Sequence, residues 1–415
     1  MKYLCGDYDM YMKSICLLTC LFLTVSAWGK SVEGLQSDSI VQTLKTEGFE
    51  DIQALQDSDT LYLSIEDRAH RGTFRGAVAA IKQVTEKHPD VQRVEMLLTD
   101  YKMPQLIVHA FKREGTWDIS VDRQMERARQ MLRDVKPQVA STGRIDITVF
   151  PIISLVNNKL DHLFDYCIRI APAFAATLWK GARLTLQPVF PILHNLDEDE
   201  TGRYIQIGQA NLSQQILSTS RWQISAAAGF FHPERAGAQA KVTFHAMRNL
   251  DIFVDAGYTY GFNYSKQKGL GFIRGSQQFN FMAHANYYEP HTKLEIELQG
   301  GRFLYGDYGG RLDVSRHFGE YVIGVYGILT GGEYNAGFHF AIPMGGKRQK
   351  RSAFVRLRLP EYYGLEYSMQ SFFKYWEEKM GQSYATQPDQ NRASHYWEPA
   401  YVEEYIRKML NGNFK

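Results

Sequence analysis

Several side chains of this 415-residue chain have the types needed for acid–base or nucleophilic chemistry. A hydrolytic site needs a nucleophile beside a histidine whose ring a carboxylate orients, and Ser315 stands two residues from His317. Glu295 and Glu297 fall on one face of an extended segment, where paired carboxylates can exchange protons. Neither pair lies in a recognisable catalytic motif. Further candidate histidines are His232, His245, His284, His291 and His339.

No spacing of histidines and cysteines is typical of a metal site. We therefore predict no catalytic residue, no metal and no cofactor, and we interpret the histidines as the polar lining of a sheet. Glu295 and Glu297 are expected to face Arg or Lys of neighbouring strands.

The elements that carry these residues follow from the alternation after Gly143. Apolar and polar side chains alternate there in segments of about 10 to 14 residues, separated by turn residues, which places every second side chain on one face of a sheet. Ile252 and Val254, for example, alternate with Asp251 and Asp255. About twelve such segments occur between Ile145 and Met344, and residues 353–369 hold a further one broken at Pro360.

This repetition predicts a mainly β chain with an outer-membrane antiparallel β-barrel of about 12–14 strands at residues 143–369. Strands of about 9 to 11 residues span a bilayer, and the polar face is too polar for a soluble core. A soluble β-sandwich remains the alternative, because alternation does not say which face is outside. Candidate lumen-facing binding residues are Asp251, Asp255, Asn280, Asn286, Glu295, Glu297, Arg302 and Asp313.

The N-terminus predicts export. Lys13 precedes an apolar stretch at residues 15–27 that ends in small residues, so residues 1–29 are interpreted as a signal peptide. Cleavage would leave Cys167 as the single cysteine and exclude an intrachain disulfide. The formal net charge of +2 argues against a nucleic-acid partner.

Residues 36–112 predict a small periplasmic α+β domain in which two helices cover a four-stranded sheet. Its best helix is residues 73–87, whose apolar side chains recur at helical spacing. Residues 113–142 are expected to form a connector, with a helix over residues 121–135 whose arginines are solvated. Residues 370–415 are expected to form a C-terminal tail with a helix near residues 401–410.

Residues 301–316 read GRFLYGDYGGRLDVSR, and residues 337–344 read GFHFAIPM. These stretches, together with residues 74–89, resemble the YjbH-like family. The resemblance implies an outer-membrane protein of exopolysaccharide biosynthesis or export, with a periplasmic domain before a barrel. The family motif implies no catalytic residue, and this chain is shorter than the members commonly are.

We therefore expect a non-enzymatic barrel in the outer membrane, with its N-terminal domain in the periplasm. Its partners would be outer-membrane lipid, a polysaccharide and periplasmic envelope proteins. Two alternatives stay open: a barrel enzyme that acts on lipid or glycan, and a plugged barrel that only anchors the periplasmic domain.

Overall fold

The computed structural model describes residues 38–156, 165–196, 201–265, 269–349, 354–369, 375, 378–388 and 394–412. The predicted signal peptide, residues 1–29, lies outside the described residues. Antiparallel sheets dominate the described chain, so the prediction of a mainly β protein is confirmed. Among its described helices, none has the length and apolar character needed to cross a membrane.

A small α+β unit is built on a five-stranded sheet in the order β1-β2-β3-β4-β5. The parallel pair β2 and β3 is joined through helix α3, and the other neighbours are antiparallel. Helix α3 forms where predicted, and its apolar Phe74, Ala77 and Ile81 are fully buried. The elements are α2 (Asp38–Glu47), β1 (Glu50–Asp57), β2 (Thr60–Glu66), α3 (Thr73–Lys87), β3 (Arg93–Asp100), β4 (Met103–Arg113) and β5 (Thr116–Asp122).

The C-terminal helix α6 (Pro399–Leu410) completes the core of this unit. Val402 and Ile406 are fully buried there, and the rings of Phe74 and Tyr405 lie 4.0 Å apart between centroids. We call the small sheet, its two helices and α6 the cap. The chain thus begins and ends its described course in one hydrophobic core.

The connector is less helical than predicted. Strand β5 takes residues 116–122, and helix α4 covers only Glu126–Met131. Arg127 and Arg133 are exposed as expected, but Arg123 is buried and donates to Asp251, and Arg129 donates to the Ser218 carbonyl at 2.9 Å. Its basic residues therefore do more than solvate a helix, because two of them bind the large sheet.

The large sheet contains fifteen strands, twelve of them long and joined in sequence order by antiparallel pairing. Short β13 (Gly269–Phe272) pairs only with β12. The long strands are β6 (Ile145–Val156), β7 (Asp165–Thr177), β8 (Ala182–His194), β9 (Gln206–Ser218), β10 (Trp222–Phe231), β11 (Arg235–Met247), β12 (Leu250–Ser265), β14 (Gln278–Glu289), β15 (Leu294–Arg302), β16 (Tyr308–Phe318), β17 (Tyr321–Thr330) and β18 (Glu333–Pro343).

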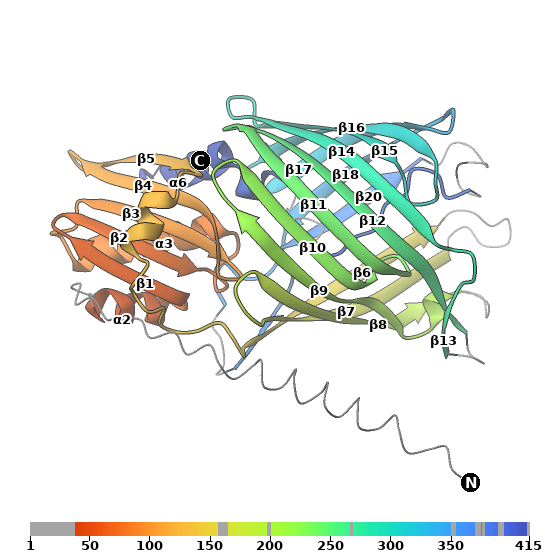
Figure 1. Cartoon of the computed structure of the whole chain (residues 1–415), viewed down its shortest axis with the longest axis horizontal. Coiled ribbons are helices and arrows are strands. Elements are labelled where there is room, and N and C mark those ends of the chain that lie inside the picture. The colour runs from red at the N-terminus through yellow and green to blue at the C-terminus, as the bar shows by residue number, and fades with distance from the viewer. Residues whose placement is uncertain are drawn as a thin grey trace, which may run out of the picture.

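The two ends of this sheet are consecutive in the chain. β19 (Val355–Arg358) pairs in parallel with β6, and β20 (Tyr362–Ser368) pairs antiparallel with β18. Only residues 359–361 separate them, and they include Pro360, which offers no backbone N–H to a ladder. The broken segment predicted at residues 353–369 thus supplies both edge strands, and the sheet curls so that some strands pass in front of others (Figure 1).

The large sheet exposes its apolar face and buries its polar face, which is the reverse of the arrangement in a water-soluble protein. On the apolar face, Val254 is 45% exposed and Leu298 is 57% exposed, whereas on the polar face Asp251 is 6% exposed and Thr259 is fully buried. We call these the outer face and the inner face. Alternation alone did not say which face of the sheet is outside. The exposures show that the apolar side chains are outside and that the polar side chains point inward.

The cap covers one end of the large sheet, beside the C-terminus (Figure 1). Arg71 and Arg75 both bind Glu320 in the turn between β16 and β17. Burial alone would raise the pKa of Glu320, but hydrogen bonds from these two arginines outweigh it and hold that pKa below its ordinary value. Two poorly solvated salt bridges therefore hold this turn against the cap.

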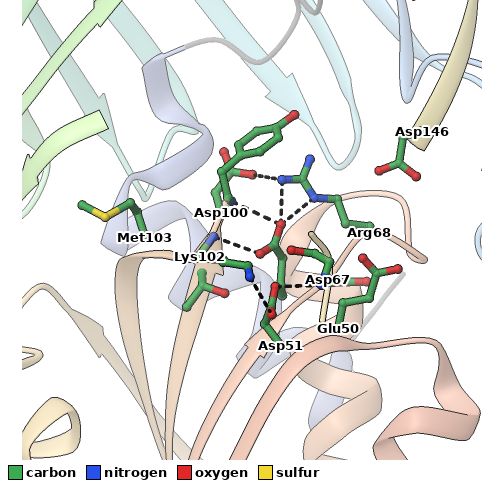
Figure 2. A network of polar contacts seen from close by, with 12 residues as sticks. Glu50, Asp51, Asp67, Arg68, Asp100, Lys102, Met103 and Asp146 are labelled. Atoms are coloured by element: carbon green, nitrogen blue, oxygen red, sulfur yellow. Dashed lines mark hydrogen bonds and ion pairs between the residues drawn. The ribbon is translucent and has the colours of Figure 1, made fainter. Parts of the chain in front are cut away.

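A second contact region lies where the cap meets β6, and Figure 2 shows its charged side chains. Arg68 donates to Glu66 at 2.7 Å and to Asp100 at 3.1 Å, and its guanidinium lies 3.7 Å from the Tyr101 ring centroid. Fully buried Arg356 of β19 donates to Glu50 at 2.8 Å. The Arg68 contacts lie within the cap, and the buried ion pair of Arg356 with Glu50 joins the cap to the large sheet.

Candidate functional site

The inner face of the large sheet carries several histidines, and each of them contacts a carboxylate of an adjacent strand or, for His339, of the next strand but one. We expected Arg or Lys opposite Glu295 and Glu297, but the described partners that the structure places there are histidines. The contacts are His245 with Asp251 at 2.8 Å, His284 with Asp255 and with Glu297 at 2.9 Å each, His317 with Glu295 at 3.0 Å, and His339 with Asp313 at 2.9 Å.

Most of the candidate binding residues thus come together on one surface. Asn280 and Asn286 also lie on it and are buried, at 5% and 1% exposure. Arg302 does not join them. It ends β15 on the same alternation as Leu298, and it donates to the Phe279 carbonyl and to Gln278 at the end of the sheet opposite the cap.

The Ser315 side chain lacks the geometry of a catalytic triad. Its hydroxyl donates to Asp313 at 3.0 Å and lies 3.3 Å from Nε2 of His339, the same nitrogen that contacts Asp313. A triad needs the hydroxyl and the carboxylate on opposite ring nitrogens. The predicted neighbour His317 contacts Glu295 instead. Within the described ranges, no group of three His, Cys, Asp or Glu side chains is arranged to hold a metal ion.

The C-terminal segment crosses the interior of the large sheet. We call its described residues between 375 and 398 the strap. At the end opposite the cap, the Gly381 backbone donates to Asp307 at 2.7 Å, and Gln382 accepts from the Leu304 backbone at 2.9 Å. Met380 is buried there against Tyr326 and Ile328. The strap therefore starts from the turn between β15 and β16.

Further along, the strap binds the inner face of other strands. Ala385 and His232 exchange two backbone hydrogen bonds of 2.7 and 3.2 Å, and Asn211 donates to the Thr386 carbonyl at 3.0 Å. The Tyr384 ring stacks on Phe231 with 5.4 Å between centroids. The strap thus forms an added backbone partner within the interior rather than a loose tail.

At the cap end, the strap reaches Arg123. This guanidinium donates to Asp251 at 3.1 Å and to the Trp397 carbonyl at 3.0 Å, and it lies 3.7 Å from Glu398. Burial raises the pKa of Glu398 to about 9, with Asp251 adding to the rise and Arg123 opposing it. Glu398 therefore holds a proton at neutral pH, just before α6 enters the cap.

The strap borders two cavities in the interior. The larger, of about 490 Å³, lies against β6 and the strands β15 to β18, and its polar lining includes Gln209, Arg311, Asp313, Ser315, His339 and Glu366. The smaller, of about 400 Å³, lies between β8 to β12 and the cap. Volumes of this size are within the range of small-molecule sites.

Sequence reasoning missed the strap, because no periodicity marks residues 375–398. The available signal was the aromatic content of an otherwise polar tail, with Tyr384, Tyr396 and Trp397 far from any strand. Such side chains seldom remain in water, so a tail that carries them is expected to dock.

Comparison with known proteins finds no matching family model, no similar curated protein and no similar solved structure. The resemblance to the YjbH-like family stays a prediction, and the site is interpreted from its own geometry.

Replacement of Glu398 tests the account of the strap end. Because the folded-state pKa is raised from 4.5 to about 9, the protonated carboxyl contributes stability that is complete below pH 4.5 and is lost as the pH rises towards 9. Glu398→Gln keeps the group neutral, so the variant should lose less stability than the natural chain between pH 5 and pH 9 in thermal unfolding. Glu126→Gln, at an exposed residue of α4, is the control. An unchanged pH dependence for Glu398→Gln would contradict this account.

Proposed function

We propose that the large sheet is an outer-membrane β-barrel whose outer face contacts lipid. The observation that carries the proposal is the reversed polarity: apolar side chains such as Val254, Leu298 and Val325 are 45–60% exposed, while polar side chains of the opposite face, such as Asp251, Asn286 and Glu295, are buried. A water-soluble sandwich would bury the opposite face. The consecutive edge strands β19 and β20 support a sheet whose two ends meet.

Exposed aromatic side chains near both ends of the strands support the same proposal. Trp179, Trp222 and Tyr321 lie near the cap-end turns, and Tyr308 and Tyr334 follow turns at the opposite end. Aromatic belts at the two interfaces are typical of membrane barrels.

The lengths of the turns give an orientation. Between consecutive long strands, the turns at the cap end are short, for instance residues 248–249 and 319–320, whereas two connections at the other end are longer, residues 195–205 and the stretch 266–277 that contains β13. Bacterial barrels have short periplasmic turns and longer extracellular loops. We therefore place the cap in the periplasm, where it is available to periplasmic envelope proteins.

We further propose that the protein takes part in exopolysaccharide biosynthesis or export. Support comes from the resemblance at residues 301–344 and from two polar cavities whose hydroxyl, amide and charged groups suit hydroxyl-rich chains. The strap occupies the interior, so a polymer could pass only after the strap had moved. Energy for transport would come from inner-membrane partners.

The strap also favours a second candidate, a plugged barrel that anchors the cap. The enzymatic alternative gains no support, because Ser315 and Asp313 share one nitrogen of His339.

A deletion experiment tests the functional proposal. Cells that lack this protein should display less surface polysaccharide than the parent when extracted sugar is quantified, and the natural gene should restore it. A complementing Leu298→Arg chain should fail, because arginine on the lipid face costs roughly 2–4 kcal/mol at the bilayer midplane. Gln299→Arg, one residue away on the inner face, is the matched control. Normal polysaccharide in the deletion strain would contradict the proposal.

Conductance in planar bilayers separates an export route from a permanent plug. We expect little conductance from the natural chain and a several-fold increase from the double variant Tyr384→Ala and Ala385→Pro, which removes the ring stacked on Phe231 and a backbone donor to His232. Tyr308→Ala, at an exposed outer residue, is the control. Equal conductance of all three chains would show that the strap does not close the interior.

A further inference from the structure

The smaller cavity, beside the cap, has an unusual charge distribution. Its lining includes two carboxylates, Asp100 and Asp251, and both are paired. Asp100 accepts from Arg68 at 3.1 Å, and Asp251 accepts from Arg123 and lies 2.8 Å from His245. No negative charge of the described lining is left over.

Two cations of the same lining lack such partners. Lys241 lies with its Nζ 3.8 Å from the centroid of the Phe253 ring; it forms no salt bridge within the described residues, and Asp255 is its main charged neighbour. Arg183 lies over the Tyr101 ring at 5.1 Å, and its buried Nε has no hydrogen-bond partner among the described residues. A buried donor without a partner, such as the Arg183 Nε, costs free energy, and the Lys241 ammonium adds a second positive charge. The two groups are therefore suited to an anionic ligand.

The rest of the lining suits a sugar. Gln223 and Gln239 supply amide groups, and the half-buried Trp397 supplies an aromatic ring on which the apolar face of a pyranose can pack. A volume of about 400 Å³ is small for a polymer and adequate for one or two sugar units. The cavity also lies at the cap end, where the proposed orientation has a periplasmic ligand arrive.

We propose that this cavity is a binding site for an acidic sugar, whose carboxylate is held by Lys241 and Arg183 and whose ring packs on Trp397. This inference rests on the proposed function, since it names the chemical class of glycan that the protein handles. It adds a selectivity that the general polarity of a barrel interior does not supply.

The test is calorimetric titration of the full-length chain in detergent micelles with digalacturonate and with neutral maltose. We expect digalacturonate to bind at least about tenfold more tightly than maltose. Lys241→Gln and Arg183→Gln should each weaken digalacturonate binding by about tenfold, while Lys241→Arg retains it. Lys180→Gln, at an exposed residue outside the cavity, is the control for lost net charge.

Equal affinity for the two disaccharides, or binding that neither Gln variant weakens, would overturn the acidic-sugar site. Displacement of digalacturonate by the same concentration of inorganic sulfate would overturn the part assigned to the sugar ring. The acidic-sugar site and the export role can be rejected independently of each other. A polysaccharide defect in the deletion strain without digalacturonate binding would reject this site alone, and binding without a defect would reject the export role alone.

Discussion

Burial of the polar face of the large sheet is the constraint on which the rest of the structure depends. Carboxylates such as Asp251 and Glu295 are 6% exposed, and a buried charge is tolerated only when it is paired and hydrogen-bonded. The inner-face histidines meet this requirement by pairing with the carboxylates, and Arg123 from the connector pairs with Asp251. The polar interior is therefore a cooperative unit, in which loss of one partner leaves another charge unpaired.

The strap and the cap also provide partners for the buried polar groups of the large sheet. The strap supplies backbone groups and side chains to the inner face, and its continuation α6 is buried in the cap core beside Phe74. The cap in turn binds the sheet through Glu320 and Arg356. Because one segment is anchored at both ends, movement of the strap and movement of the cap are mechanically coupled, and any ligand that bound the cap would be placed to influence the interior.

The local pattern predicted much of the fold. Alternation located the twelve long strands, and helical spacing located α3, since both reflect side chains within one element. The fifth strand of the cap and the strap depend on long-range contacts, such as the pairing of β5 with β4 and of Ala385 with His232. For the site, sequence parity placed Asp251 and Asn280 on one face, but it gave no means of pairing His284 with both Asp255 and Glu297, because strand register decides which side chains meet.

The most direct test of the central claim is the environment of the outer face in a lipid bilayer. Nitroxide labels would be placed at Leu298→Cys and, as the inner-face counterpart, at Gln299→Cys, in a chain otherwise free of cysteine. Collision rates with oxygen and with a water-soluble nickel complex would then be compared. The account predicts that the label at 298 meets oxygen and scarcely meets nickel, as a lipid-facing side chain does, whereas the label at 299 is shielded from lipid. Ready access of nickel to the label at 298 would contradict a membrane-embedded outer face.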